Sequence, residues 1–164
     1  MSLFDTYRDQ YAFNRTRTLG LLDRIEKMTD APSILGWCPG VGRAHIGWQL
    51  MHIGVTEELF AVERLANKEG RFRDLWSRFR GGSTPDDDVP SIAQIRDVLA
   101  GGRDDLLVTL GEQDPAKLDE VVWEAPDGRR LSLRNILQII SWHEAHHQGQ
   151  AHITLNLYNS QPKG

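Results

Sequence analysis

Cysteine is almost absent from this sequence, which contains Cys38 alone and therefore cannot form a disulfide within the chain. The first ten residues also lack the basic and apolar regions of a secretory signal peptide. No apolar run approaches the roughly 20 residues that a helix needs to cross a bilayer. We therefore expect a cytoplasmic protein that has no membrane partner.

A basic stripe is missing as well. The 19 lysines and arginines are scattered among 23 aspartates and glutamates, and the formal net charge is -4. Proteins that bind nucleic acids neutralise phosphates with clustered basic side chains. We expect no nucleic-acid partner for this chain.

The remaining composition is typical of a globular domain. The chain has 164 residues, of which 40% are hydrophobic and 26% are charged. A chain of this length can bury about two-thirds of the surface that it exposes when unfolded. We interpret residues 1–164 as a single domain.

Four long segments carry the hydrophobic period of an amphipathic helix, with apolar residues three or four positions apart. We predict helices over residues 3–29, 43–69, 91–110 and 133–158. Ser91 and Gln94 form a capping-box pattern at the start of the third helix, and Ser132 can cap the fourth. The adjacent Gly101 and Gly102 predict a kink or a close helix contact within the third helix.

The segments between these helices contain helix breakers and turn residues. Residues 31–42 hold two prolines and three glycines, which predicts a loop. In residues 71–90, aromatic residues are followed by the run TPDDDVP, and we expect helical order to fade there into an exposed loop. Residues 121–133 place a Pro-Asp-Gly turn between two β-prone runs, which indicates a small hairpin. The predicted fold class is all-α, a four-helix bundle with a short β-hairpin before the last helix.

Histidines are crowded in the last predicted helix, where His143, His146, His147 and His152 fall within ten residues. Residues four apart on a helix lie one above the other, so His143 and His147 can bind one metal ion through two nitrogens. Their face of the helix is otherwise apolar, which predicts that the pair faces the core. His146 and His152 point elsewhere, and we expect them to face solvent or to lie beside the site.

A third metal ligand must come from another helix. His52 lies between Leu50 and Ile53 in the second predicted helix, so we expect it to face the interior. His45, near the start of that helix, is a weaker candidate. Three histidines leave coordination positions open for water or substrate, as in reactive metal sites. Buried histidines can also be hydrogen-bonded core residues that bind no metal.

The last helix also contains the HExxH pattern, from His143 to His147. In zinc proteases the glutamate of this pattern, here Glu144, acts as the general base. The extended protease pattern requires glycine and histidine seven and ten residues after the first histidine. Those positions hold Gln150 and Ile153, which argues against a protease.

Three glutamates near the histidines have two possible roles. Glu57, Glu58 and Glu144 could orient imidazoles through their second nitrogen, although exposed glutamates are more common at such positions. Cys38 lies in the predicted loop GWCPGVG, where a thiol is most often inert. The sequence assigns no residue a catalytic role.

Three patterns occur together along the chain. A glycine- and proline-rich loop precedes the histidine of QLMHIGVTEEL, PS-x-x-x-I-R begins the third helix, and HEAHHQGQ lies in the last helix. Over nearly its whole length the chain thereby resembles the DinB-like metal-binding superfamily. The resemblance implies a four-helix bundle of the up-down-down-up type, with a divalent metal, often zinc or nickel, held by three histidines. The corresponding residues here are His52, His143 and His147.

The resemblance implies several reactions, since this superfamily includes thiol S-transferases that use bacillithiol or mycothiol, a maleylpyruvate isomerase and helical domains of sulfoxide synthases. Our first hypothesis is a divalent-metal-dependent enzyme that transfers a low-molecular-weight thiol, because a bound metal lowers the pKa of a thiol. A metal-dependent hydrolase is the second hypothesis. A non-catalytic, stress-related bundle that binds a metal or a ligand is the third.

The middle of the chain contains more aromatic residues than the apolar faces of the predicted helices can bury. We therefore expect some of them to form the contact of a homodimer. Family members are often dimers, and the resemblance implies the same. The aromatic residues concerned are Trp37, Trp48, Phe60, Phe72, Trp76 and Phe79.

Overall fold

The computed structural model describes residues 2–162 and is mostly helical, with six α-helices and one two-stranded antiparallel hairpin. This confirms the predicted helical class and the hairpin before the last helix. In chain order the elements are α1 (Leu3–Glu26), α2 (Ala31–Gly36), α3 (Ile46–Glu58), the π-helix η1 (Leu59–Leu65), α4 (Arg73–Phe79), α5 (Ile92–Gly111), the 3-10 turn η2 (Pro115–Lys117), β1 (Val121–Glu124), β2 (Arg130–Ser132) and α6 (Leu133–Asn159).

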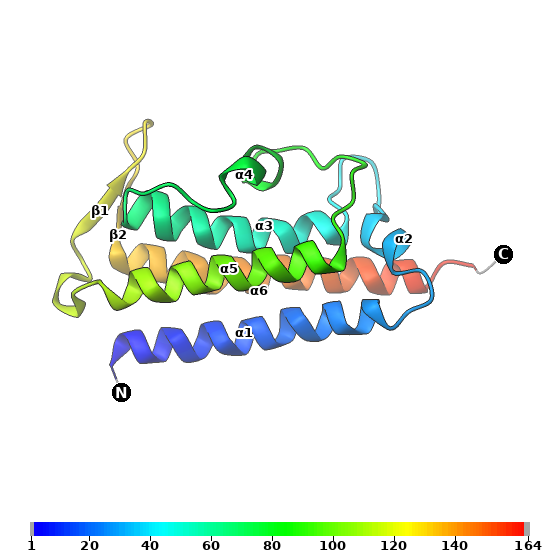
Figure 1. Ribbon diagram of the computed structural model, residues 1–164, viewed down its shortest axis with the longest axis horizontal. Helices are drawn as coiled ribbons and strands as arrows, with labels where there is room; N and C mark the ends of the chain where they lie inside the picture. The colour runs from blue at the N-terminus through cyan, green and yellow to red at the C-terminus, as the bar shows by residue number, and fades with distance from the viewer. Residues whose placement is uncertain (1, 163–164) are drawn as a thin grey trace.

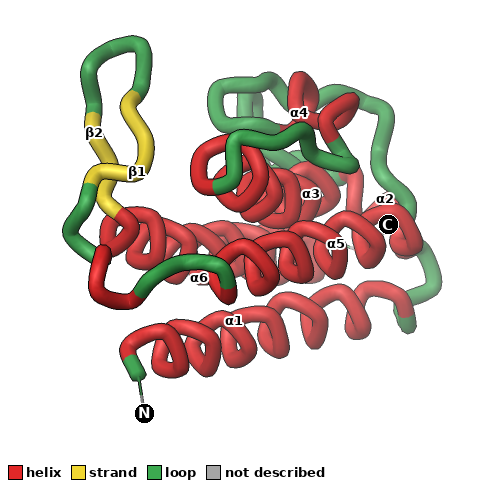
Figure 2. Tube along the Cα trace, turned by 60° about the vertical axis from the view of Figure 1, so that its left-hand side comes forward, coloured by secondary structure: helices red, strands yellow, loops and turns green. Residues whose placement is uncertain are grey.

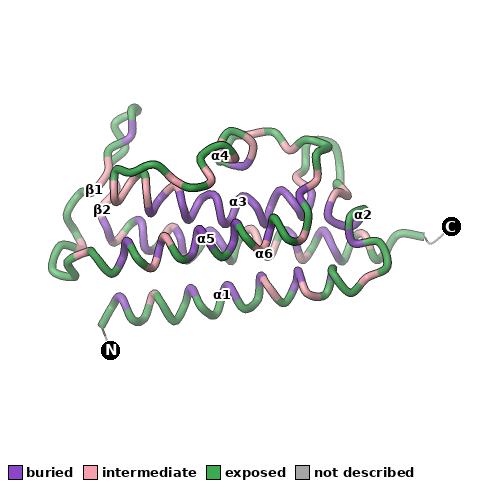
Figure 3. The backbone as a smooth tube through the Cα atoms, viewed as in Figure 1, coloured by how far each residue is buried: buried purple, intermediate pink, exposed green. Residues whose placement is uncertain are grey.

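Four long helices, α1, α3, α5 and α6, lie side by side along the length of the molecule (Figures 1 and 2). The hairpin lies at the same end as the N-terminus, and α2 lies near the opposite end together with the C-terminus. The short helix α4 covers α3 from outside. All 13 residues of α3 are consequently buried, as its continuous purple trace in Figure 3 shows.

Side-chain caps fix where three of the long helices begin. Ser132 accepts a hydrogen bond from the Asn135 backbone N–H, and the Asn135 side chain reciprocates at the start of α6. Ser91 accepts from the Gln94 backbone N–H at 3.2 Å at the start of α5. Both helix starts were predicted from the sequence. Ser2 caps α1 in the same reciprocal way, through Asp5.

The predicted close helix contact occurs where α3 crosses α5. A Cβ atom on Gly102 would overlap the carbonyl group of Gly54, and a Cβ on Gly54 would lie 2.6 Å from the carbonyl oxygen of Val98. The two glycines therefore let the backbones of α3 and α5 touch. This contact holds the helix that carries His52 at a fixed depth in the molecule.

The two segments that connect α1 to α3 and α3 to α5 contain short helices. Helix α2 lies within residues 31–42. It can form there because Pro32 occupies the first turn, where a missing N–H costs no hydrogen bond, and because Asp30 accepts a hydrogen bond from the Ser33 backbone N–H. Helix α4 lies within residues 71–90, and the burial of Phe79 in the core stabilises it. The prediction of a loop over residues 31–42 was wrong at α2, because a short helix can be stabilised by packing that no local pattern reports. In residues 71–90 the helix gives way to a loop after Phe79, as expected.

The second predicted helix, residues 43–69, is also shorter and less regular than expected. It begins at Ile46 after the cap residue His45, and from Leu59 to Leu65 the chain continues as a π-helix. Its last turn closes with Asn67 in the left-handed region at φ 51°. Helix α1 likewise ends at Glu26, three residues before the predicted end.

Among the helices of residues 2–162, none combines the length and the apolar character that crossing a membrane requires.

Candidate metal centre

Three histidines from two helices meet inside the molecule. His52 projects from α3, and His143 and His147 project from adjacent turns of α6; one nitrogen of each lies within 4.8 Å of the others. The Nε2 atoms of His52 and His143 are 2.9 Å apart, a distance at which two ring nitrogens share either a proton or a metal ion. His52 is 5% exposed and His143 is 9% exposed. The structure thus brings together the three residues that the sequence singled out.

Backbone and amide oxygens fix the orientation of two of these rings. The Nδ1–H of His52 donates to the backbone carbonyl of Phe79, at the end of α4. The Nδ1–H of His147 donates to Oε1 of Gln49, one turn before His52 on α3. Each bond leaves the Nε2 lone pair of its ring free, which is the arrangement that metal-binding histidines usually have. Helix α4, missed in the sequence, therefore has a direct role at this centre.

Burial keeps the cluster uncharged. Desolvation, reinforced by the other histidines, lowers the pKa of His143 to about 2 and that of His147 to about 3. Desolvation also lowers the pKa of His52. All three imidazoles are neutral near pH 7, so their lone pairs are available to a cation.

An aromatic side chain closes one side of the cluster. The Trp48 ring stacks on His52, with ring centroids 4.6 Å apart and planes 17° apart, and it meets His147 edge-on at 6.5 Å. The Trp48 indole N–H donates to the backbone carbonyl of Arg78 at 3.0 Å. The ring of His52 is therefore held by packing as well as by its hydrogen bond.

The donor set suits a divalent metal such as zinc or nickel. Nitrogens bound to one tetrahedral ion lie about 3.3 Å apart. In the cluster one pair of nitrogens is 2.9 Å apart and one nitrogen of each ring lies within 4.8 Å of the others. Imidazole is a preferred ligand of both metals. His52, His143 and His147 could therefore hold a metal ion with small ring rotations.

The other histidines do not join the cluster. His45 is the cap of α3: it accepts from the Trp48 backbone N–H and its second nitrogen donates to the Asp86 carbonyl. His45, the weaker candidate for a metal ligand, therefore has a structural role. His146 is exposed and stacks on Trp142 with centroids 4.7 Å apart. His152 is half-buried and lies five residues after His147 on α6.

Two of the three glutamates form a buried ion-pair network with two arginines that we did not single out. Glu144 accepts from Arg15 at 2.7 Å and from Arg103 at 2.6 Å, and Glu57 accepts from the same arginines at 2.7 and 2.6 Å. Thr18 adds a hydrogen bond to Glu144 at 2.8 Å. The four charged residues come from α1, α3, α5 and α6 and balance one another within the core.

The prediction that Glu57 and Glu144 are exposed is therefore wrong. The prediction that they orient the histidine rings is also wrong, because arginines occupy their carboxylates. Glu58 is buried too, and it accepts from the backbone N–H of Phe72 and the indole N–H of Trp76. Glu144 turns away from the histidines, so it cannot act as the general base that the HExxH pattern requires.

A signal for this network does exist in the sequence. Arg15 follows Tyr11 by four residues and precedes Leu22 by seven, and Arg103 stands in the same relation to Leu99 and Leu110. These spacings place both arginines on apolar helix stripes. An arginine on such a stripe requires a buried anionic partner.

A cavity of about 700 Å³ adjoins the histidine cluster. His143 and Thr56 line it at the cluster, and its other walls come from η1 and from α4 with the loop that follows. A cavity of this size accommodates a small organic molecule. The candidate metal centre therefore borders a space that a small molecule could enter.

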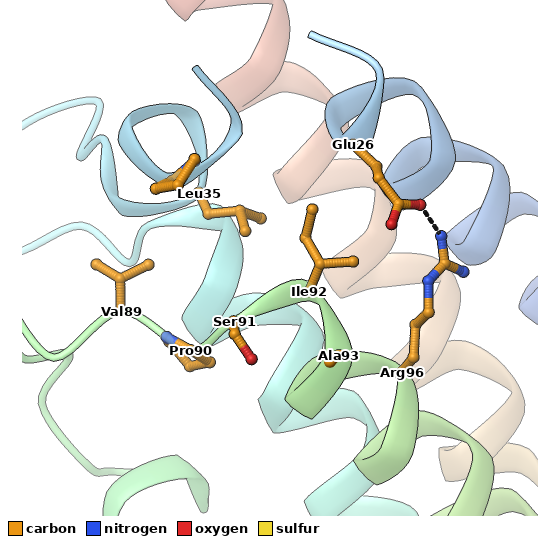
Figure 4. A pocket seen from close by; sticks show the side chains of 9 residues that line it. Glu26, Leu35, Val89, Pro90, Ser91, Ile92, Ala93 and Arg96 are labelled. Atoms are coloured by element: carbon orange, nitrogen blue, oxygen red, sulfur yellow. Dashed lines mark hydrogen bonds and ion pairs between the residues drawn. The ribbon is translucent and has the colours of Figure 1, made fainter. Parts of the chain in front are cut away.

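A second cavity, of about 590 Å³, lies away from the histidines between the end of α1, α2 and the start of α5 (Figure 4). Its walls are largely apolar, with Leu35, Val89 and Ile92 among them. At its edge the Arg96 guanidinium donates to Glu26 at 2.6 Å. Its polar side chains are engaged in structural contacts, because Ser91 caps α5 and Glu26 pairs with Arg96, so we assign the chemistry to the histidine cavity.

The fold and the site together define a helical protein whose interior holds three neutral imidazoles able to bind one metal ion. The family model described as DinB superfamily matches residues 10–151, a range that includes all three histidines. The chain belongs to the DinB superfamily, as its sequence resemblance indicated. None of the curated proteins gives a significant match.

Proposed function

We propose that the protein is an enzyme that depends on a divalent metal, zinc or nickel, and transfers a small thiol to an electrophile. His52, His143 and His147 are the proposed ligands. The observation that carries the proposal is the composition of the cluster: within the described chain it contains three neutral imidazoles and no carboxylate or thiolate, and it adjoins a cavity through His143.

A divalent ion in this cluster would lower the pKa of a thiol bound to it and so supply a thiolate near neutral pH. The neutral ligands leave the positive charge of the ion uncompensated, which favours an anionic sulfur over a neutral donor. Phe79 and Gln49 hold the rings of His52 and His147 in position, and His143 borders the cavity. Cys38 lies exposed on a loop outside the cluster, and the sulfur must therefore come from a separate molecule.

The position of Glu144 favours thiol transfer over hydrolysis. A metal-dependent hydrolase usually needs a general base beside the metal. The glutamate nearest to the proposed ligands in sequence is engaged by Arg15 and Arg103 instead. A thiol needs no separate base once its pKa has fallen below neutral pH.

The test is a conjugation assay on protein loaded with zinc or nickel. Cysteine, glutathione, bacillithiol and mycothiol are each offered with monochlorobimane, whose thiol adduct is fluorescent. We expect the wild-type protein and His146→Ala to accelerate conjugation of at least one thiol and His147→Ala to lose this activity. Loaded protein that accelerates none of them refutes the transferase proposal, and turnover of an ester panel by the same sample would identify a hydrolase.

We also propose that residues 1–164 form one domain and that the four long helices make an up-down-down-up bundle. The arrangement of α1, α3, α5 and α6 in Figure 1 supports this topology. The hairpin and α4 are then additions at the end and on the side of the bundle.

A homodimer remains a proposal as well, although the structure corrects the reason for it. Trp48, Phe60 and Phe79 are buried within the chain, so these three of the six aromatic residues cannot form a dimer contact. Large exposed apolar side chains occur instead on one face of α6, at Trp142, Ile153 and Leu157, which is consistent with a contact between two copies. Sedimentation at micromolar concentration should give twice the chain mass of 18.6 kDa.

A further inference from the structure

We infer that the cavity beside the histidines binds a small molecule that carries a carboxylate, and that Arg64 is the residue that binds this group. The inference rests on the proposed function in one respect, because it assigns the carboxylate to the thiol substrate. It defines the substrate class as a thiol that bears a negative charge at some distance from its sulfur.

Arg64 lies in the wall of the cavity, on the π-helix that continues α3 beyond His52. Four residues of this helix line the cavity. A π-helix is rare and is found frequently at functional sites. The π-helical residues that face the cavity are Leu59, Phe60, Glu63 and Arg64.

Two aromatic rings fix the guanidinium group of Arg64. Its central carbon lies 3.9 Å from the centroid of the Phe60 ring and 4.4 Å from that of Trp123, on β1. Because rings cover the guanidinium, the N–H groups along its edge are the ones left to donate hydrogen bonds. Such an edge matches the two oxygens of a carboxylate. The hairpin therefore has a function here, since β1 supplies Trp123.

The guanidinium of Arg64 lacks a hydrogen-bond partner within residues 2–162. Its Nε atom is buried and has no hydrogen-bond acceptor among the described residues, and no aspartate or glutamate of residues 2–162 forms an ion pair with it. The fully buried Arg15 and Arg103, in contrast, are each paired with two glutamates. An unpaired charge in a partly desolvated position is costly, and an anion that accepts hydrogen bonds from the terminal NH2 groups of Arg64 would reduce that cost.

The surrounding charges also favour an anion. Arg80 lines the same cavity and forms no ion pair within the described part of the chain. Glu63 is the acidic residue of the lining, and it is exposed and does not pair with Arg64. A divalent ion at the histidines would add further positive charge beside His143, which lines the same cavity.

The test compares two matched thiols on protein loaded with cobalt(II), because a thiolate bound to cobalt gives a charge-transfer absorption band. The probes are 3-mercaptopropionate and 3-mercapto-1-propanol, which differ in the carboxylate. We expect wild-type protein to bind the acid about ten-fold or more tightly than the alcohol. Arg64→Met keeps an apolar stem between the two rings and should remove this preference. Arg64→Lys keeps the charge without the planar fork and should retain part of it.

The matched control is Arg24→Met, which removes an exposed arginine of α1 that does not line this cavity. It should leave the preference unchanged. An equal preference in wild-type protein and Arg64→Met overturns the inference, as does an equal loss in Arg24→Met. Circular dichroism and thermal melting establish that each variant is folded.

A second arm separates the inference from the proposed function. If neither thiol produces the band, thiol binding to the metal is refuted, and succinate is then titrated into metal-free protein while tryptophan fluorescence is followed. Trp76 lines the cavity and Trp123 contacts Arg64, so binding should change their emission. A saturable response to succinate that is absent with succinamide and in Arg64→Met supports the anion site. The lack of any saturable response in the wild-type protein refutes it.

Discussion

At the scale of single residues, the proposed metal centre depends on the nitrogen that each histidine ring leaves free. His147 illustrates this: Gln49 takes its Nδ1–H, so Nε2 remains for the ion. The same imidazole without a fixed partner would rotate and could offer either nitrogen. The residues next to the ligands are therefore expected to affect metal affinity almost as clearly as the ligands.

Replacing any one of His52, His143 and His147 by alanine should reduce the metal content of the purified protein to near zero, since two neutral imidazoles seldom hold zinc or nickel tightly. His146→Ala is the matched control, because this ring is exposed and stacks on Trp142. The measurement is elemental analysis after reconstitution and dialysis. A His146 variant that loses metal as completely as the His147 variant would show that the wrong face of α6 has been chosen.

Replacing Gln49 by methionine should weaken metal binding about 10- to 100-fold, because the orientation of His147 is lost while the ligand itself is kept. The affinity is measured by competition with a chelator of known strength. Gln94→Met is the control, since Gln94 is an exposed residue of α5 that lies outside the histidine cluster. Equal affinities in the two variants would contradict a positioning role for Gln49.

At the scale of the elements, the crossing of α3 and α5 sets the depth of His52. Gly54 and Gly102 meet there with no room for a side chain. Gly20, on an exposed face of α1, has open space around the same position. The two sites offer a matched comparison of the same substitution.

Gly102→Ala should lower the free energy of unfolding by about 1–3 kcal/mol, because the added methyl group separates α3 from α5. Gly20→Ala should raise it by about 0.4–1 kcal/mol, because alanine reduces the entropy of the unfolded chain. Urea denaturation followed by circular dichroism measures both. A Gly102 variant as stable as the Gly20 variant would contradict the close contact.

At the scale of the whole molecule, the buried ion pairs join all four long helices. Arg15, Glu57, Arg103 and Glu144 contribute one charge each from α1, α3, α5 and α6. Removing one charge leaves an unbalanced arginine in the interior, which is more costly than losing the pair as a whole.

Glu144→Gln should therefore lower the free energy of unfolding by about 3–5 kcal/mol. The metal affinity of the folded variant should be unchanged, because the Glu144 side chain does not contact the histidines. Glu124→Gln, in an exposed pair with Arg130 on the hairpin, should change stability by less than about 1 kcal/mol. If the Glu144 variant has normal stability but no activity, Glu144 acts as a general base and not as a structural ion-pair residue.

The sequence alone determined the features that depend on local geometry. The 3.6-residue period located the long helices, Ser91 and Ser132 marked two helix starts, and a Pro-Asp-Gly turn identified the hairpin. The four-residue spacing of His143 and His147 placed both rings on one side of α6. These features need no knowledge of distant parts of the chain, because neighbouring residues along the chain fix them.

The tertiary structure decided everything that joins distant segments. Whether Glu144 would face the histidines or the arginines depended on where α1 and α5 pack against α6. The carbonyl that orients His52 comes from α4, whose place is fixed by the burial of Phe79. The π-helix and the position of Arg64 between Phe60 and Trp123 likewise depend on contacts between η1 and the hairpin. Local patterns cannot report such contacts, because their free energy arises when segments far apart in the chain come together.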